Sequence, residues 1–458
     1  MFEKTIKDIC TMIDVKNDLS SFDAVVVKGV SIDTRKIESG NLFVPFKGEN
    51  VDGHQFVRQA IDNGASAALW DVNVPNPPED IPVIVVEDPL LALQDLANKY
   101  RHELDLKVVG ITGSNGKTTT KDIVANLLSV KYRVHKTQGN YNNHIGLPLT
   151  ILSLPQDAEV AVLEMGMSGF GEIELLSEIS QPDAAIITNI GESHLQDLGS
   201  REGIAKAKLE IVKGLKTDGL FAYYGDEPLL QEGVKSLGLK HMETFGRSES
   251  NTIYPTKIEM NNQGSYFETS FAEGETFYLP VLGQHNIHNA LAGILIARHF
   301  GLSVGEMKEG LQSLKLTQMR MEMLEGAKGE SIINDAYNAS PTSMKAAIGL
   351  VSELEGFRMK ILVLGDMLEL GENEDDFHKE IGRMIDSEKI QQVFTFGPLA
   401  ALIAEGALEN FPEDRVHSFS DKENLTSELS SIIKGDELIL FKASRGMKLE
   451  EIIDGLKA

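Results

Sequence analysis

A glycine-rich segment between an apolar run and a helical pattern constrains this chain of 458 residues most strongly. The segment has the sequence GITGSNGKTTT over residues 110–120. The run LKVV at 106–109 predicts a buried parallel strand before it, and apolar residues at helical spacing follow over 121–128. Strand, glycine-rich turn and helix form the context of a phosphate-binding loop. The sequence therefore predicts an α/β fold with a phosphate group at this turn.

The residue types of the loop suit a nucleotide. Glycines let backbone N–H groups converge on phosphate oxygens, and the helix N-terminus adds partial positive charge. Lys117 is expected to reach the β- and γ-phosphates, and the Thr118 hydroxyl to bind Mg²⁺. The spacing departs from the common G-x-x-x-x-G-K-[ST] pattern, because Ile111 stands where its first glycine would fall. A glycine-rich turn without a ligand is the alternative that this departure leaves open.

Composition restricts the partners and the compartment. The net charge of −26 argues against broad binding of nucleic acid or of an anionic membrane surface. The single cysteine, Cys10, excludes a disulfide within the chain and fits a reducing compartment. The charged N-terminus lacks the apolar core of a signal peptide, and no apolar run approaches about 18 residues. We expect a cytoplasmic protein without a membrane span.

The length and the pattern predict three domains. Residues 1–101 are expected to form a small mixed α/β domain, with short apolar strands and two helices. Residues 102–316 are expected to hold the phosphate loop in a parallel sheet, with an antiparallel sheet added over the alternating stretch 252–283. Residues 317–458 alternate strand and helix, which predicts a Rossmann-like, doubly wound parallel sheet without a phosphate loop.

Polar residues follow the predicted strands of the second domain. Glu164 ends an apolar strand, where ligands of open α/β sheets gather, so it is a candidate ligand of Mg²⁺. His194 follows the next strand and is a candidate for a second metal ion or for orienting a water. Asn286 and Asn289 share one side of a helical first turn and suit an adenine edge or a ribose, with helix capping by Asn286 as the alternative.

Two further groups of charged residues remain open on residue chemistry alone. Arg35 and Lys47 are able to hold an anion such as a diphosphate, or they belong to a turn with surface charges. Lys206 and Lys208 are two positions apart on a predicted helix, so at most one is expected to face a site. The strands of the last domain end near Asp335, which makes a ligand crevice there plausible.

Taken together, these motifs resemble the Mur ligase family along nearly the whole chain. The resemblance is carried by TGSNGKTT (112–119), LEMG (163–166), TNIG (188–191) with His194, AKAK (205–208), HNIHNA (285–290), Met319-Arg320 and NDAYNA (334–339). Two stretches, GNYNNHIGLP (139–148) and LGDMLELG (364–371), are similar to the member that adds a dipeptide. The tetrapeptide DNPR of the sibling that adds diaminopimelate or lysine does not occur in this sequence.

The resemblance implies an ATP-dependent ligase of three domains, one each for a UDP-sugar peptide, ATP and the incoming dipeptide. It implies UDP-N-acetylmuramoyl-tripeptide and D-alanyl-D-alanine as partners, two Mg²⁺ ions as cofactors and a monomer. The phosphate-loop residues assigned to ATP are Gly113, Asn115, Gly116, Lys117, Thr118 and Thr119.

By resemblance, several other residues receive roles. Arg320 matches an arginine that reaches the γ-phosphate, and Asn289 and Asp335 match adenine and ribose contacts. The implied metal ligands are Thr118, Glu164, His194 and Lys208, the last as a carbamate; the implied catalytic residues are Lys117, Lys208, His194 and Arg320. The implied substrate-binding residues are Ser31, Arg35, Phe46, Lys47, Gly48, Asn140, Asn143, Tyr337 and Asn338.

One departure and two alternatives accompany the resemblance. Ala443 stands in Lys442-Ala443-Ser444-Arg445 where the family more often has glycine. A folylpolyglutamate-type ligase is the close alternative, although it need not carry the region before residue 100 that is assigned to UDP. A nucleotide switch or ATPase acting on a protein partner also explains the phosphate loop and Glu164, but gives Lys208 no role.

Overall fold

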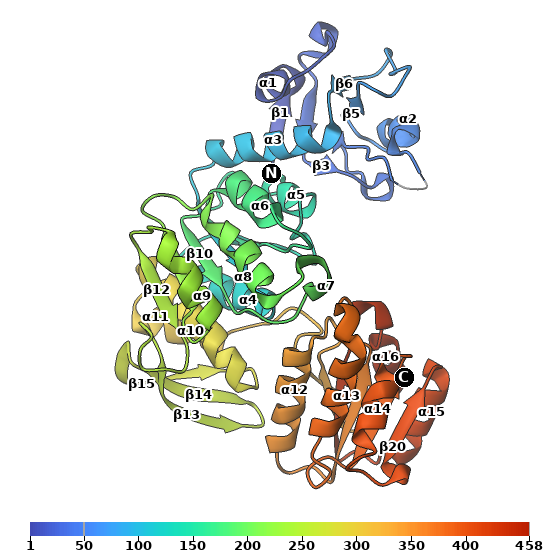
Figure 1. Cartoon of the computed structure of the whole chain (residues 1–458). Helices are drawn as coiled ribbons and strands as arrows, with labels where there is room; N and C mark the ends of the chain where they lie inside the picture. Colours follow the sequence, from blue (N-terminus) through green and yellow to red (C-terminus); the bar gives the residue numbers. More distant parts are fainter. Residues whose placement is uncertain (49–50, 458) are drawn as a thin grey trace. The chain divides into compact units, whose positions relative to one another are not determined.

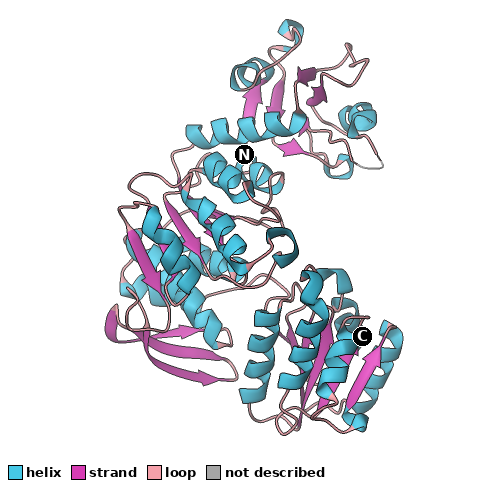
Figure 2. Cartoon of the chain, in the orientation of Figure 1, coloured by secondary structure: helices cyan, strands magenta, loops and turns pink. Residues whose placement is uncertain are grey.

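The computed structural model describes residues 1–48 and 51–457, and they form helices and strands that alternate over most of the chain (Figures 1 and 2). These residues group into two compact units. The first unit contains residues 1–112, 131–186 and 210–221, and the second contains 113–130, 187–209 and 222–458. Among the described residues, no helix combines the length and the apolar character that a membrane crossing needs.

Short strands build the start of the first unit. Strands β1 (Glu3–Thr5) and β2 (Val26–Lys28) pair antiparallel. A second, parallel sheet has the order β3-β4-β5-β6 and consists of Val30–Ser31, Leu42–Phe43, Ala67–Asp71 and Val83–Val86. The helices of this part are α1 (Ile6–Met12), α2 (Val57–Asp62) and α3 (Pro89–Glu103). Helix α3 begins as predicted, because Asp88 caps it and Pro89 is preorganised for its first position.

A six-stranded sheet has the order β12-β11-β10-β7-β9-β8. Its strands in chain order are β7 (Lys107–Thr112), β8 (Val134–Lys136), β9 (Val160–Glu164), β10 (Ala184–Ile187), β11 (Leu220–Tyr224) and β12 (Met242–Phe245). The helices between and after these strands are α4 (Lys117–Ser129), α5 (Gly146–Leu152), α6 (Glu172–Ser180), α7 (Leu195–Leu198), α8 (Arg201–Leu209) and α9 (Pro228–Gly233). Strands β7 and β8 both pair parallel with β9.

The alternating stretch 252–283 forms the antiparallel sheet that its pattern predicts. Its strands are β13 (Pro255–Asn261), β14 (Gly264–Thr269) and β15 (Ala272–Leu279). Helices α10 (Gln284–His299) and α11 (Val304–Gln312) follow. Helix α10 packs against α4, the helix that follows the phosphate loop.

The last sheet has the order β16-β17-β21-β18-β19-β20. Its strands in chain order are β16 (Glu322–Glu325), β17 (Ser331–Asn334), β18 (Met359–Gly365), β19 (Gln392–Phe396), β20 (Val416–Phe419) and β21 (Glu437–Lys442). Its helices are α12 (Pro341–Glu353), α13 (Glu374–Met384), α14 (Ala400–Ala407), α15 (Lys422–Ile432) and α16 (Glu450–Lys457).

Both faces of this sheet are covered by helices, as a doubly wound sheet requires. Leu362 and Leu440 belong to one apolar core with residues of α12, α13 and α14. Ile361 and Phe441, their neighbours along the strands, belong to a second core with residues of α15 and α16. The sheet differs from the prediction in one strand, because β16 pairs antiparallel with β17. The connection between them, residues 326–330, is too short for the crossover that a parallel pair needs.

Candidate nucleotide site

At two positions of the phosphate loop, only glycine can adopt the backbone conformation that the structure shows. It connects β7 to α4, and Gly113 and Gly116 have φ values of +149° and +80°. A Cβ atom on Gly113 would lie 1.8 Å from Thr188 Oγ1, and one on Gly116 would lie 2.8 Å from Asn289 Oδ1. Both the dihedral angles and the close neighbours therefore exclude a larger residue.

Residues after β10 fix the loop from one side. The Ser114 N–H donates to the Asn189 carbonyl at 3.1 Å, and the Asn115 N–H donates to Asn189 Oδ1 at 2.9 Å. The Asn189 side chain also donates to the Asn115 carbonyl, and so does the Thr188 hydroxyl. From the sequence, Thr188 and Asn189 were predicted only as part of a family motif and received no role of their own. Their position directly after a buried strand is the signal that could have assigned them to the loop.

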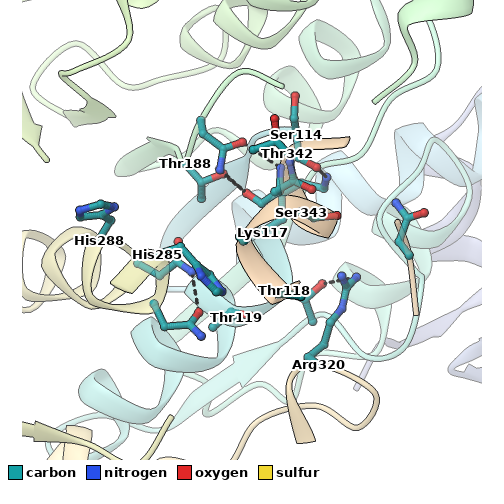
Figure 3. A pocket seen from close by; sticks show the side chains of 18 of the residues that line it. Ser114, Lys117, Thr118, Thr119, Thr188, His285, His288, Arg320, Thr342 and Ser343 are labelled. Carbon is teal, nitrogen blue, oxygen red and sulfur yellow. Dashed lines mark hydrogen bonds between the residues drawn. The ribbon is translucent and has the colours of Figure 1, made fainter. Parts of the chain in front are cut away.

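A cavity of about 500 Å³ opens beside the loop, within the second unit (Figure 3). Its predicted lining residues are Asn115, Gly116, Lys117, Thr118, Thr119, Asn289, Arg320, Asp335 and Asn338. Lining residues to which no role was assigned from the sequence include Ser114, Thr188, Asn189, Glu192, Arg201, Tyr224, Glu227, His285, His288, Met321, Thr342 and Ser343. The cavity thus brings together most of the residues that were predicted to bind ATP.

Lys117 and Thr118 begin α4 at the mouth of the loop. The Lys117 ammonium donates to the Gly113 carbonyl at 2.7 Å, which folds the side chain back over the loop. The Arg320 guanidinium donates to Thr118 Oγ1 at 3.3 Å and points at it in Figure 3. These cations and the N-terminus of α4 make this end of the cavity suited to an anion.

Arg320 is held in a strained segment. Met319 and Met321, its neighbours, have φ values of +63° and +53°, which are unusual for residues with long side chains. The Arg320 guanidinium lies over the Tyr337 ring, 4.2 Å from its centroid. The Met321 N–H donates to Asp335 Oδ1 at 3.2 Å. Strain of this kind persists where surrounding contacts enforce it, and it is common at functional sites.

Asp335 also forms an ion pair with a buried lysine. The Lys442 ammonium lies 2.5 Å from Asp335 Oδ2 and donates to the Asn338 carbonyl at 3.1 Å. Lys442 is only 2% exposed, so its charge depends on this partner. The pair fixes the carboxylate that faces the cavity.

The first turn of α10 supplies amides and uncharged histidines. Asn289 donates to Asn286 Oδ1 at 3.0 Å, and Asn286 donates to the Leu282 carbonyl at 2.7 Å. Asn286 therefore holds a carbonyl before the helix rather than capping the helix N–H groups, whose N-cap residue is Gly283. Burial lowers the pKa of His285, and it lowers that of His288 to about 4, helped by the charges of His285 and Arg247.

Burial also lowers the pKa values of His194 and Lys208. Burial and the Lys117 and Lys208 charges lower the pKa of His194 to about 4. Burial and the Lys117 charge lower the pKa of Lys208 well below its usual value. Lys208 is 1% exposed whereas Lys206 is exposed, so only one of the two lysines faces inward, as expected. His194 Nδ1 lies 3.1 Å from Glu369 Oε2, but its angles are not those of a hydrogen bond.

Glu164 belongs to the first unit, at the end of β9. It is 3% exposed, and its Oε1 accepts a hydrogen bond from Asn142 at 2.9 Å. Asn142 lies between the predicted substrate residues Asn140 and Asn143, which are both exposed. Asn143 instead accepts the N–H groups of Ile145 and Gly146 at the start of α5. Of these three asparagines it is Asn142, to which no role was assigned, that binds the buried Glu164 carboxylate.

The residues predicted to bind the UDP part of the substrate lie in the first unit, and they do not all line the same cavity. Ser31 lines a second cavity, of about 310 Å³, together with Asp33, Lys36, Lys136 and Tyr141. Arg35 is not among its lining residues. The Arg35 guanidinium instead pairs with Asp33 at 2.8 Å and lowers the pKa of that carboxyl to about 2.

Phe46, Lys47 and Gly48 lie beside Val51, Asp52 and Gly53. Lys47 pairs antiparallel with Asp52, and the Gly48 N–H donates to the Val51 carbonyl at 2.9 Å. Lys47 and Gly48 are exposed.

The predicted metal ligands suit Mg²⁺ in chemistry. Among the described residues, no group of three or more His, Cys, Asp or Glu side chains could hold a metal ion. Mg²⁺ usually keeps several waters and binds one or two carboxylates with substrate phosphates, so it does not need such a group. The buried carboxylate of Glu164 and the orphaned Nδ1 of uncharged His194 are groups that a cation satisfies. The residues present therefore fit the ion.

Comparison with protein families places three matches along the chain. A model described as "Mur ligase family, catalytic domain" matches residues 26–101, "Mur ligase middle domain" matches 111–297, and "Mur ligase, glutamate ligase domain" matches 319–445. The UDP-N-acetylmuramoyl-tripeptide–D-alanyl-D-alanine ligase of Bacillus subtilis (strain 168) is 54% identical over 458 residues, covering 100% of this chain and 99% of the relative. The chain belongs to the Mur ligase family.

Solved structures agree with this membership. A crystal structure of MurF from Acinetobacter baumannii superposes with a TM-score of 0.88 at 30% identity, covering 99% of each chain. MurF ligase from Thermotoga maritima in complex with ADP superposes with a TM-score of 0.83 at 31% identity, covering 94% of this chain and 97% of the other. These likenesses confirm the predicted Mur ligase fold for this member of the family.

Replacing Gly116 by alanine tests the close approach of Asn289. We expect Gly116→Ala to destabilise the chain by about 1–2 kcal/mol through its φ angle and to raise the Kd for ADP at least tenfold. Gly171→Ala is the matched control, because Gly171 has the same φ of +80° and no described atom lies within 4 Å of its added Cβ. Urea unfolding and ADP titration measure both effects. Equal ADP affinity in the two variants would contradict the role of the contact.

The buried His288 predicts a pH-dependent stability. Its described neighbours include His285, Arg247 and Asp226, and its ring lies 5.5 Å from that of Tyr224. The folded pKa of about 4 is below the unfolded value, so the unfolded chain takes up a proton that the folded chain refuses. The contribution of His288 to the free energy of unfolding is therefore retained above pH 6.5 and is lost as the pH falls toward 4.

Between pH 7 and pH 5 the free energy of unfolding of the unmodified chain is expected to decrease. In His288→Gln this decrease should be smaller by about 2 kcal/mol. Urea unfolding at the two pH values measures this loss. His241→Gln is the control, because His241 is exposed and its replacement should leave the pH dependence unchanged. An unchanged loss in His288→Gln would show that His288 titrates normally in the folded chain.

Proposed function

We propose that this chain is the ATP-dependent ligase that joins D-alanyl-D-alanine to the terminal carboxylate of UDP-N-acetylmuramoyl-tripeptide. The products are ADP, phosphate and UDP-N-acetylmuramoyl-pentapeptide, a precursor of peptidoglycan. One observation carries the proposal: the phosphate loop, Arg320 and Asp335 line one cavity in a chain that is 54% identical, end to end, to a ligase of that name. A nucleotide switch would not need this likeness over all three matched segments.

The three predicted domains divide the substrates between them. In this proposal residues 1–101 bind the UDP-sugar peptide, residues 102–316 bind ATP, and residues 317–458 bind the dipeptide. The three family matches support this division, because they cover 26–101, 111–297 and 319–445. Ser31, in the lining of the smaller cavity, supports the assignment of the first segment.

The first chemical step activates the carboxylate of the tripeptide. One of its oxygens attacks the γ-phosphorus of ATP, the bond from that phosphorus to the β–γ bridging oxygen breaks, and ADP leaves. The product is an acyl phosphate. Lys117 and Arg320 spread the charge on the transferring group, since positioning and electrostatics do most of the work in phosphoryl transfer. Their places at the loop end of the cavity support these roles.

The second step forms the amide bond. The free amine of D-alanyl-D-alanine attacks the acyl carbon, the carbon–oxygen bond to phosphate breaks, and the nitrogen gives up a proton. The acyl phosphate reacts with water as well as with amines, so the site must exclude solvent. Tyr337 and Asn338, predicted substrate contacts, belong to the loop after β17 that also carries Asp335.

Two Mg²⁺ ions complete the proposed site. The residues that would hold them are Thr118, Glu164, His194 and Lys208. The ions neutralise phosphate charge when bound. The lowered pKa of Lys208 leaves an amine able to take up CO₂, which forms an N–C bond, releases a proton and supplies an anionic oxygen.

We also propose that the ligase acts as a monomer in the cytoplasm. The single Cys10 supports a reducing compartment, and the occurrence of all three family matches in one chain supports a monomer. Neither nucleic acid nor a membrane surface suits a chain with a net charge of −26.

The function is tested by phosphate release from ATP with Mg²⁺ and UDP-N-acetylmuramoyl-tripeptide, with and without D-alanyl-D-alanine. We expect release to depend on the dipeptide, with an equal amount of UDP-linked pentapeptide found by mass spectrometry. A folylpolyglutamate-type ligase would use a different acceptor. Release that ignores both small substrates would overturn the proposal in favour of an ATPase.

Lys208→Met tests the carbamate, because methionine preserves the buried chain length but cannot take up CO₂. We expect kcat to fall about 10²- to 10³-fold, the size typical of removing one group that stabilises developing charge. In ¹³C-bicarbonate, a carbamate signal is expected for the unmodified chain and not for the variant. Lys206→Met, at an exposed position of the same helix, should retain both the activity and the signal. Equal activity of the two variants would remove Lys208 from the site.

A further inference from the structure

A buried aspartate on the helix after the phosphate loop holds the segment that carries Arg320. The Thr317 N–H donates to Asp122 Oδ2 at 2.7 Å. Asp122 is 1% exposed and lies on α4, four positions after Thr118. Residues four apart occupy the same face of a helix, so Asp122 and Thr118 lie one turn apart along it.

The other end of the same segment reaches Thr118. The Arg320 guanidinium donates to Thr118 Oγ1 at 3.3 Å, three residues after the amide that Asp122 holds. One face of α4 thus binds both ends of residues 317–320. The segment connects α11 to β16 and has no regular secondary structure of its own.

The conformation between the two ends is specific. Met319 has a φ of +63°, and its N–H donates to Glu322 Oε2 at 3.0 Å. Met321 has a φ of +53°. A segment in such angles relaxes to other conformations when a contact is removed, since this backbone region is unfavourable for residues other than glycine. Its anchors therefore decide where the guanidinium lies.

We infer that Asp122 is a positioning residue for Arg320: it fixes the amide of Thr317 so that the arginine reaches the phosphate end of the cavity. The inference rests on the proposed function, in which Arg320 contacts the γ-phosphate. Asp122 itself lines no part of the cavity. Helix α4 would in this way set the position of Arg320, which lies 202 positions after Thr118 of that helix in the sequence.

A carboxylate suits this task better than a neutral side chain. A hydrogen bond from an N–H group to a charged oxygen is shorter and stronger than one to a neutral oxygen. The other oxygen, Asp122 Oδ1, lies 3.6 Å from the ammonium of the buried Lys121. This neighbour compensates the buried charge.

The matched control is Asn126, one turn further along α4. Its side chain donates to the Gly310 carbonyl and, at 3.0 Å, to the Ser313 hydroxyl. Asn126 thus also bonds from α4 to a residue distant in sequence, but it holds the end of α11 rather than the segment with Arg320. Asn126→Ala is expected to leave kcat within about twofold of the unmodified chain.

The experiment is a double-mutant cycle on dipeptide-dependent phosphate release. We expect Asp122→Ala to lower kcat about 10- to 100-fold with little change in KM for the UDP-tripeptide, because a small displacement of a catalytic group costs a factor of this size. Combined with Arg320→Ala, it should lower kcat no further than Arg320→Ala alone. Asp122→Asn, which retains an acceptor for the Thr317 amide, should recover most of the loss.

A second variant keeps the test independent of the fold of α4. Thr317→Pro removes the N–H donor and leaves Asp122 unchanged. It should reproduce the loss of Asp122→Ala and should likewise add nothing to Arg320→Ala. Losses that multiply in both double variants would show an effect independent of Arg320 and overturn the inference.

The two proposals fail in different ways. If the unmodified chain releases phosphate without the dipeptide, the proposed function fails before any variant is compared. If the unmodified chain ligates and both Asp122→Ala and Thr317→Pro retain full kcat, only the inference about Asp122 fails.

Discussion

The close approach of side chains to two glycines is the constraint on which the site depends. Thr188 and Asn289 come so near to Gly113 and Gly116 that any Cβ atom there would collide with them. The loop is thereby placed between the residues after β10 and the first turn of α10. Loop residues and the start of α4 then line one cavity, and every proposed role of Lys117, Thr118 and Arg320 follows from that placement.

Burial gives the same region unusual electrostatics. His194 and His288 have pKa values lowered to about 4, so their imidazoles are uncharged at neutral pH, and burial lowers the pKa of Lys208 well below its usual value. An uncharged imidazole is able to donate or accept, and an uncharged lysine is able to react with CO₂. The positive charges of Lys117 and Arg320 lie at the end of the cavity where phosphates are proposed to bind.

The parts of the fold with strong local signals could be predicted from the sequence. The phosphate loop, helix α3 with its Asp-Pro start and the antiparallel strands after residue 252 all carry such signals, and the structure contains each of them. Strand β16 was not predicted, and its antiparallel pairing with β17 departs from the expected parallel sheet, because periodicity does not reveal how a strand pairs. Asn142 and Asn189 received no role, because their partners are distant in sequence and only the fold brings them together.

The most direct test is a crystal structure with a non-hydrolysable ATP analogue, Mg²⁺ and UDP-N-acetylmuramoyl-tripeptide. The account predicts the terminal phosphate against Thr118 and Arg320, the base beside the first turn of α10, and the tripeptide carboxylate facing that phosphate. A nucleotide bound outside this cavity, or Arg320 remaining away from the phosphates with all these ligands bound, would contradict it.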